Sequence, residues 1–446
     1  MSDEPAAADL NAGGFRPVAD EVYETDLPVR GEIPADLNGR WLRNGPNPHS
    51  MSFDGNDYFS WFLGDGMVHG IHLEGGRALS YRNRYVRTKA LAAKEGAEVD
   101  PDTPSNTNVI PLGSKLLSLC ETGVPYEITT ELETVGPQDF GGSLPGGTMS
   151  AHPKFDAHTG ETLAFDYNWQ EPYGRYWVFD SDGEITHETT LDVSGPVMMH
   201  DFAVTQSYSV FMDLPVVFDL EMAMAGMTIP YRWQDDHQAR IGVIPRHGDT
   251  VQWFDIDPCF VFHTMNAYET ADTVVLDAVR YDRLLSYDLP SRTWSDMFNP
   301  GYLTRFELNL TTGVASQTEV AEVNVEFPRV ADLAVGRPYQ HGYSVEFQPD
   351  LVNSRGLARF DLESGAVERW EHAPGDLVGE PLFVPRQGAA PGTEDDGYVI
   401  YPIYRAAEDR SALEIRAAGE LNGPAIGSVE LPCRIPAGFH GNWVGL

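Results

Sequence analysis

The stretch VMMHDFAVTQSYSVFMDLPV, residues 197–216, sets the pattern on which the rest of the chain can be interpreted. Its apolar residues form two runs separated by polar ones, which predicts a buried strand, a turn and a second buried strand. His200 and Asp201 lie in the first run. A buried imidazole must be hydrogen-bonded, protonated at a cost in free energy, or bound to a metal. By itself, such a histidine is more often a core residue than a ligand. Its meaning depends on whether other histidines share its setting.

A hairpin pattern returns along the whole chain of 446 residues. Each instance has alternating apolar and polar residues on both sides of a short Gly- or Asn-containing turn, which predicts a β-hairpin. The seven instances are GIHLEGGRALSYR from Gly70, KFDAHTGETLAF from Lys154, VFDSDGEITHETT from Val178, LSYDLPSRTWS from Leu285, TRFELNLTTGVASQTEV from Thr304, ARFDLESGAVERW from Ala358 and EIRAAGELNGPAIGSVEL from Glu414.

This repetition predicts an all-β fold, a seven-bladed β-propeller of about 64 residues per blade. A pair of large sandwiches is the alternative, and the lack of a linker-like stretch disfavours it. We expect residues 1–30 to be a flexible acidic lead-in and residues 31–446 to form a single propeller. Segments 88–107, 223–237 and 385–397 break the pattern, so loops and short helices there should form a cap over one face.

The charge balance excludes one class of partner. Sixty-seven acidic residues oppose 30 basic ones, for a net charge of −37. Such a surface repels phosphate backbones, so nucleic-acid binding is not expected. The acidic residues are spread along the chain rather than gathered in a tail, which is typical of a halophilic protein whose self-repulsion is screened by salt.

The sequence also predicts where the protein resides. It contains no run of about 20 apolar residues, so no membrane span is expected. The acidic N-terminus lacks the features of a signal peptide. The three cysteines, Cys120, Cys259 and Cys433, are far apart and imply a reduced compartment. We therefore expect a cytoplasmic protein that can contact the inner face of the cell membrane peripherally.

Four histidines stand at expected strand ends beside small or apolar residues: His152, His200, His263 and His440. Their separations of 48, 63 and 177 residues exclude a metal-binding helix motif. The inner strands of a propeller point at one axis, however, so these side chains could converge. Four neutral imidazoles would favour iron, zinc, copper or nickel over calcium or magnesium. The pair His69 and His72, which alternates on one strand, is expected to be structural.

Three carboxylates occupy apolar or turn-rich settings: Glu121, Glu326 and Glu380. A metal-bound histidine usually donates its second N–H to a carboxylate, so these glutamates are candidates for that role. The alternative is structural, with each glutamate capping backbone amides at a strand end or pairing with Arg329 or Arg386. Either way, a buried carboxylate needs a partner.

Ten blocks of this sequence resemble, in order, those of the carotenoid cleavage oxygenase family. The resemblance extends from about residue 30 to the C-terminus, and the combination of four histidine blocks and three glutamate blocks is highly specific. The blocks are RWLRNGPNP, FLGDGMVHG, SNTNVIPLGSKLLSLCETGVPYEI, MSAHPK, MMHDFAVT, VFHTMNAYE, VEFPRV, VGEPLFVPR, EDDGYVI and PAGFHGNWV.

The resemblance implies a seven-bladed propeller with one non-haem Fe(II) per chain. His152, His200, His263 and His440 match the family's iron ligands. Glu121, Glu326 and Glu380 match the carboxylates that orient His200, His263 and His440 respectively. Thr107 matches a threonine whose methyl group crowds one open coordination position. The implied reaction uses O2 to cleave a conjugated C=C bond into two carbonyl products.

The implied substrate is a lipophilic polyene, a carotenoid or apocarotenoid. The stilbene-cleaving branch of the family has a lysine immediately before the first of the three glutamates, and this chain has Cys120 there. A cysteine cannot make the contact with a phenolic substrate that this lysine makes, which counts against a stilbene-type phenol and favours a carotenoid or apocarotenoid. A stilbene or phenylpropanoid alkene is the alternative substrate. The Met- and aromatic-rich segment 214–233 could line the substrate tunnel or contact a membrane.

Two other classes compete with this interpretation. A calcium-dependent propeller hydrolase would require oxygen ligands at the axis in place of histidines. A non-catalytic interaction propeller would tolerate the loss of His200.

Overall fold

A computed structural model describes residues 12–49, 61–144, 147–227, 229–288, 293–296, 299–349, 352–390 and 392–445. Strands dominate these ranges, as the hairpin pattern predicts. The described helices are short: α2 (Lys89–Lys94), α3 (Leu220–Met224) and the 3-10 turns η1 (Gly13–Phe15) and η3 (Asp332–Ala334). No helix in the described part of the chain is long and apolar enough to cross a membrane.

The chain divides into two compact units, each discontinuous in sequence. Unit 1 comprises Met1–Ala151, Val352–Ala358 and Glu368–Leu446, and unit 2 comprises His152–Leu351 and Arg359–Val367. The expected domain organisation, one propeller over residues 31–446, stays a prediction.

In the described part of unit 1, three sheets lie wholly within the unit. Their strand orders are β1-β5-β4-β3-β34, β6-β7-β8-β9 and β2-β33-β32-β31-β29, and β30 also pairs with β31. The strands are β1 (Tyr23–Thr25), β2 (Val29–Gly31), β3 (Gly39–Pro46), β4 (Gly66–Glu74), β5 (Arg77–Tyr85), β6 (Asn108–Leu112), β7 (Lys115–Leu119), β8 (Tyr126–Ile128), β9 (Thr134–Pro137), β29 (Leu377–Val378), β30 (Leu382–Pro385), β31 (Gly397–Arg405), β32 (Arg410–Ala417), β33 (Gly427–Glu430) and β34 (Gly441–Gly445).

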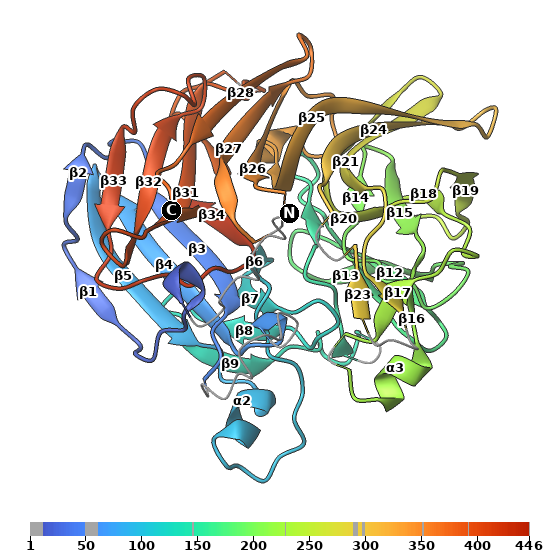
Figure 1. Ribbon diagram of the computed structural model, residues 1–446, viewed down its shortest axis with the longest axis horizontal. Coiled ribbons are helices and arrows are strands. Elements are labelled where there is room, and N and C mark those ends of the chain that lie inside the picture. The colour runs from blue at the N-terminus through green and yellow to red at the C-terminus, as the bar shows by residue number, and fades with distance from the viewer. Residues whose placement is uncertain are drawn as a thin grey trace, which may run out of the picture. The chain divides into compact units, whose positions relative to one another are not determined.

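The two ends of the chain meet within unit 1. The last strand, β34, pairs antiparallel with β3, from Gly39 opposite Gly445 to Arg43 opposite Gly441, and Figure 1 shows the two side by side. Strands β1 and β2 add to β5 and β33. Both strands lie wholly or largely within residues 1–30, and the expected lead-in over that range stays a prediction. Both are three residues long and exposed, so no apolar alternation marked them in the sequence.

The core of unit 1 joins its first and last sheets. Alternate residues of a strand point to the same face, and Ile71 and Leu73 on β4 pack with Leu413 and Ile415 on β32 in one buried cluster. Trp41 on β3 belongs to the same cluster and is almost fully buried. This packing fixes β3, and with it the paired strand β34, in a rigid frame.

Unit 2 contains the four-stranded sheets β10-β11-β12-β13 and β14-β15-β18-β19 and the two-stranded sheets β16-β17 and β22-β23. The strands are β10 (Lys154–Phe155), β11 (Thr162–Tyr167), β12 (Gly174–Phe179), β13 (Ile185–Thr190), β14 (Ala203–Val204), β15 (Tyr208–Asp213), β16 (Val216–Phe218), β17 (Tyr231–Trp233), β18 (Arg240–Pro245), β19 (Gln252–Asp255), β22 (Ser286–Asp288) and β23 (Thr293–Ser295).

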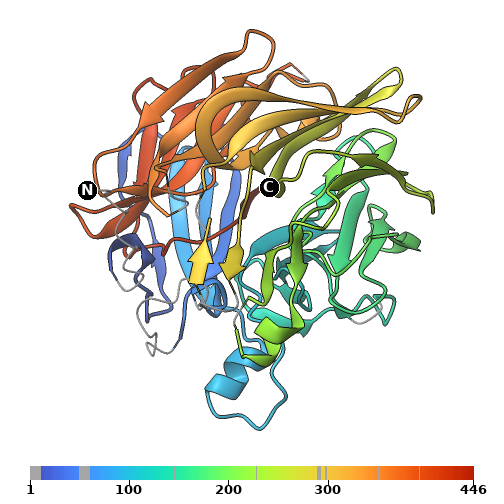
Figure 2. The same ribbon diagram turned by 45° about the vertical axis from the view of Figure 1, so that its right-hand side comes forward.

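The longest sheet has the order β20-β21-β24-β25-β26-β27-β28. Its strand β25 pairs with β24 through its first part and with β26 through its last residues. It therefore belongs to two groups of four strands, β20-β21-β24-β25 and β25-β26-β27-β28. Figure 2 shows this strand curving away from its hairpin with β24. The strands are β20 (Phe260–Thr270), β21 (Thr273–Tyr281), β24 (Tyr302–Asn309), β25 (Ala315–Arg329), β26 (His341–Phe347), β27 (Ser354–Asp361) and β28 (Ala366–Glu371).

All seven predicted hairpins are present. Six join neighbouring strands of the large sheets. The seventh, from Leu285, forms the separate two-stranded sheet β22-β23 instead of part of a blade. When the longest sheet is divided at β25, the large sheets of the described residues make seven groups of strands.

Candidate metal centre

The four predicted histidines occupy equivalent places in four sheets. His152 precedes β10 by two residues, His200 precedes β14 by three, and His440 immediately precedes β34. His263 lies within β20, at an irregularity in its register with β21. Strands β10, β14, β20 and β34 are each the terminal strand in the order of their sheet. Each imidazole is therefore carried at or near the start of a terminal strand.

Three of these histidines cluster in unit 2. The Nε2 atoms of His152 and His200 lie 3.0 Å apart, and those of His200 and His263 lie 3.2 Å apart. The three ring centroids are separated by 4.5 to 5.1 Å. His152 and His263 are buried. Ring nitrogens that converge this closely bring lone pairs together unless a proton or a cation lies between them.

Glu326 holds the ring of His263. A carboxylate only accepts hydrogen bonds, so the short contact between Nδ1 of His263 and Glu326 places the proton on Nδ1 and leaves Nε2 as a lone-pair donor. Tyr281 Oη and the Phe327 amide also donate to Glu326, at 2.8 and 2.7 Å. Burial raises the pKa of Glu326, but its interaction with His263 and the hydrogen bonds from the other two donors outweigh it, and the net pKa is lowered.

Glu380 holds His440 in the same way in unit 1. Nδ1 of His440 donates to Oε1 of Glu380 at 2.9 Å, and the amide of Gly441 donates to Oε2 at 2.9 Å. The amide of His440 donates to the carbonyl of Thr107 at 3.0 Å. Neighbours therefore hold both the backbone and the ring of His440, and the proton lies on Nδ1.

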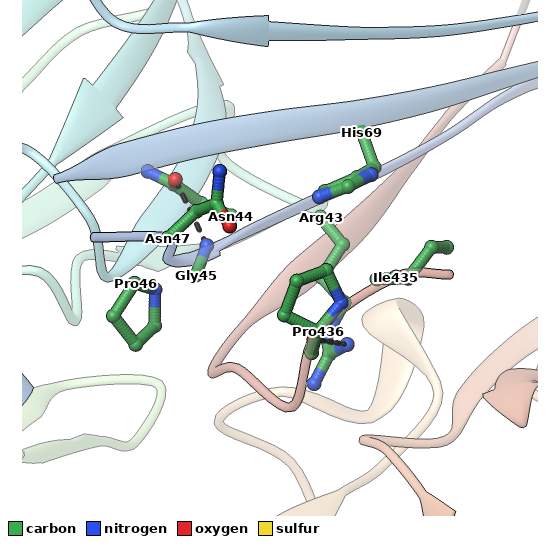
Figure 3. Close-up of a pocket in the computed structure, with 8 residues that line it drawn as sticks. All are labelled: Arg43, Asn44, Gly45, Pro46, Asn47, His69, Ile435 and Pro436. Carbon is green, nitrogen blue, oxygen red and sulfur yellow. Dashed lines mark hydrogen bonds between the residues drawn. The ribbon is translucent and has the colours of Figure 1, made fainter. Parts of the chain in front are cut away.

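A buried cation lies beside this pair. The Arg43 guanidinium donates to the carbonyls of Pro436 and Phe439, at 3.3 and 3.4 Å, in a narrow pocket that His69 also lines (Figure 3). Burial lowers the pKa of Arg43 to about 10, and the charge of Glu380 acts against this. Burial, and then the charge of Arg43, lower the pKa of His69 to about 3. At neutral pH, Arg43 is therefore charged and His69 is neutral.

The hairpin β6–β7 carries three further residues of interest. Thr107, buried just before β6, donates from Oγ1 to Asn106 Oδ1 at 3.0 Å. Glu121 lies half-buried two residues after β7. Cys120 is buried with Sγ 3.6 Å from Asn106 Oδ1, and burial raises the pKa of its thiol. The expected functions of Thr107 and Glu121 stay predictions.

Sequence reasoning missed a second set of polar residues in unit 2. Asp201 is buried and forms an ion pair with Lys154. Burial raises the pKa of Asp201. Its interactions with Lys154, His263 and the Thr264 amide lower that pKa by more, so the net pKa is below its ordinary value. The available signal was an acidic residue in the apolar run of residues 197–204, since a buried carboxylate requires partners.

One ring nitrogen from each of His152, His200, His263 and His440 can be chosen so that all four lie within 4.8 Å of one another. Such a donor set suits a borderline divalent transition ion. The carboxylates on Nδ1 of His263 and His440 support this fit, because they orient those rings. The four histidines therefore suit a metal site.

Comparisons with known proteins agree with this geometry. A family model described as "Retinal pigment epithelial membrane protein" matches residues 15–445. A carotenoid cleavage oxygenase of Mycobacterium tuberculosis is 37% identical over 97% of this chain and 96% of its own length. The solved structure of a Pseudomonas brassicacearum lignostilbene dioxygenase superposes with a TM-score of 0.90 at 29% identity, over 98% of both chains. That of cobalt-substituted Synechocystis ACO gives 0.87 at 27% identity, again over 98% of both chains.

These structural neighbours confirm the predicted fold class, an all-β seven-bladed propeller. One of these neighbours is cobalt-substituted, so a protein with this fold can hold a transition metal.

Proposed function

The chain belongs to the retinal pigment epithelial membrane protein family, and from this we propose that it is an iron-dependent dioxygenase that cleaves a carotenoid or apocarotenoid. It is an oxidoreductase, as its carotenoid-cleaving and stilbene-cleaving relatives are. The observation that carries the proposal is the four-histidine group, with a glutamate on two of its rings. The calcium-dependent hydrolase is disfavoured, because it would need oxygen ligands.

We propose Fe(II) as the metal and His152, His200, His263 and His440 as its ligands. Bound iron supplies the redox chemistry with which dioxygen is used. Glu326 and Glu380 keep the Nδ1 protons of His263 and His440 in place, so that both rings present Nε2. We assign Glu121 the same function for His200. Thr107, whose carbonyl accepts from the His440 amide, is the residue that we expect to crowd one open position.

The proposed reaction converts one conjugated C=C bond and O2 into two carbonyl products. The position before Glu121 supports a polyene over a phenolic stilbene. Cys120 is buried, its thiol pKa is raised by that burial, and its Sγ atom faces Asn106. A neutral thiol cannot replace the lysine ammonium that contacts a phenol in the stilbene-cleaving branch.

A small apolar projection in unit 2 suits the collection of a lipid-soluble substrate. Segment 214–233 folds as β16, α3 and β17, and Leu220 and Met224 on α3 are 59% and 81% exposed. Trp169 stacks on Phe218 beside them, with ring centroids 5.4 Å apart. Because the chain is strongly acidic, we propose that this projection contacts neutral lipid through apolar burial.

The decisive experiment is product analysis by mass after incubation of the iron-loaded enzyme with carotenoids, apocarotenals and stilbenes. We expect two carbonyl fragments from a carotenoid or apocarotenal, formed only in the presence of O2. His263→Ala should abolish cleavage. His187→Ala should retain it, because that histidine lies on β13 and bonds Gly248 O at 3.1 Å. Cleavage of stilbenes alone would establish the alternative substrate, and a fully active His200→Ala variant would overturn the enzymatic assignment.

Membrane contact is tested separately by sedimentation with phosphatidylcholine vesicles. Leu220→Ser combined with Met224→Ser should release the protein from the vesicles. Leu333→Ser is the matched control, because this 43% exposed leucine lies on η3 outside the projection. Equal binding by all three proteins would exclude the projection as the contact surface.

A further inference from the structure

Asp201 is the acceptor at the centre of a buried hydrogen-bond cluster. Its Oδ1 atom accepts from Lys154 Nζ at 2.7 Å and from the Phe202 amide at 2.8 Å. Its Oδ2 atom accepts from the amide and the hydroxyl of Thr264, at 2.9 and 2.8 Å. The carboxylate is 1% exposed. Four donors, one of them a cation, therefore contact this carboxylate.

The partners of Asp201 stand close in sequence to three different histidines. Lys154 follows His152 by two residues, Asp201 follows His200 directly, and Thr264 follows His263 directly. The cluster therefore connects the beginnings of β10 and β14 with β20. One carboxylate fixes three segments whose imidazoles meet within 3.0 to 3.2 Å.

We propose that Asp201 and Lys154 are positioning residues that fix the mutual geometry of His152, His200 and His263 for metal binding. This rests on the proposed function, since it assumes that these histidines are ligands. Residues that do not bind the metal but orient its ligands typically contribute about 10- to 100-fold to metal affinity. The three ligands are far apart in sequence, so their alignment depends on contacts between strands.

The Asp201 cluster differs from other buried ion pairs of this unit because its members are neighbours in sequence of candidate metal ligands. Asp277 on β21 is also buried and accepts from Arg305 Nε and Nη2, at 2.8 and 2.9 Å, and from Tyr339 Oη at 2.7 Å. None of these residues is adjacent in sequence to a candidate ligand. Asp277 is therefore a matched control from the same unit.

The test measures Co²⁺ binding to the apo protein by visible absorption, in competition with a chelator. We expect Asp201→Asn to weaken Co²⁺ binding by about 10- to 100-fold and to alter the absorption bands. The amide of asparagine would point a donor at groups that are themselves donors. Lys154→Met should show the same loss, and Lys154→Arg, which keeps the charge, should restore most of the affinity. Asp277→Asn should bind Co²⁺ as the wild type does.

Each outcome separates the two proposals. If the wild-type protein binds no Co²⁺, the proposed metal function fails. If the wild type binds but Asp201→Asn binds equally tightly with an unchanged spectrum, the positioning function is wrong. An equal loss in Asp277→Asn would show that the effect is general destabilisation.

A milder variant covers the case in which Asp201→Asn does not fold. Thr264→Val removes only the hydroxyl donor and keeps the amide and the β-branched shape that suits a strand. We expect it to fold as the wild type does and to lose Co²⁺ affinity several-fold. Wild-type affinity in this variant would overturn the proposal.

Discussion

His263 and His69 are both buried, but their Nδ1 atoms have different hydrogen-bond partners. His263 is buried and donates its Nδ1 proton to Glu326, and its Nε2 atom lies 3.2 Å from Nε2 of His200. His69 is buried with Nδ1 2.9 Å from Tyr81 Oη, and burial together with Arg43 lowers its pKa to about 3. The two residues are of the same type, but one has a carboxylate on Nδ1 and lies in the histidine cluster, whereas the other has a tyrosine hydroxyl on Nδ1 and lies in the core.

The low pKa of His69 makes the stability of unit 1 depend on pH. An unfolded histidine takes up a proton below its ordinary pKa of 6.5, whereas folded His69 resists protonation down to about pH 3. Stability from this residue is therefore fully present above pH 6.5 and is lost as the pH falls. The loss between pH 6.5 and 5 is about 2 kcal/mol, at about 1.4 kcal/mol per pH unit.

His69→Gln should remove this component, because glutamine takes up no proton. Denaturant unfolding at pH 7.5 and 5 measures the effect, and the variant should show a smaller difference in unfolding free energy between the two than the wild type. His158→Gln, at an exposed histidine, is the control and should keep the wild-type difference. An unchanged difference in His69→Gln would show that His69 is not the group responsible.

At the scale of secondary-structure elements, short strands carry much of the architecture. β10 and β14 are each two residues long, yet they begin sheets and follow His152 and His200 closely. β1 and β2 are three residues long and are terminal strands of their sheets, and β2 pairs with β33, which is distant in sequence. Such strands contribute little apolar burial, so their positions depend on backbone pairing.

The pairing of β2 with β33 can be tested at Gly31. Its φ of +75° is unfavourable for any other residue, and a Cβ atom there would lie 2.4 Å from the carbonyl oxygen of Ile426. Gly365 has a φ of +74° with no atom within 4 Å of the Cβ position. Gly365→Ala should therefore cost about 1 kcal/mol from backbone strain alone.

Gly31→Ala should cost at least about 1 kcal/mol more than Gly365→Ala, because the clash with backbone adds to the strain. Thermal unfolding of both variants measures the difference. Equal midpoints would mean that β2 does not contribute to the stability of the sheet.

At the scale of the whole molecule, the net charge of −37 is the dominant physical property. We propose that it reflects adaptation to a salt-rich setting. At 0.1 M salt, charges interact over about 10 Å, and at 1 M over about 3 Å, so added salt relieves the self-repulsion of the folded state.

The unfolding temperature should therefore rise between 0.1 and 1 M KCl. Sucrose, which stabilises proteins by exclusion without screening charge, is the control at matched osmolality. A larger rise in KCl than in sucrose supports charge screening. An unfolding temperature that falls or stays level in KCl would exclude the salt adaptation.

Several features of the fold could be predicted from sequence because they are local. Alternating apolar and polar residues on both sides of short turns correctly predicted all seven hairpins. In two of them the turn glycines, Gly75 and Gly160, have the positive φ that favours glycine. The hairpin from Leu285 was also predicted correctly, but its sheet was not. Local periodicity identifies a hairpin, whereas the neighbour it pairs with depends on the rest of the chain.

What the sequence alone determined was the chemistry available: the four histidines, three glutamates and Thr107, identified from their settings and from their order in family blocks. What only the tertiary structure decided was which groups meet. Histidines up to 288 positions apart are brought within 4.8 Å, Glu326 and Glu380 are matched to particular rings, and Asp201 joins Lys154 and Thr264. Sequence patterns report burial and turns over a few residues, but hydrogen bonds between distant strands exist only once the sheets have formed.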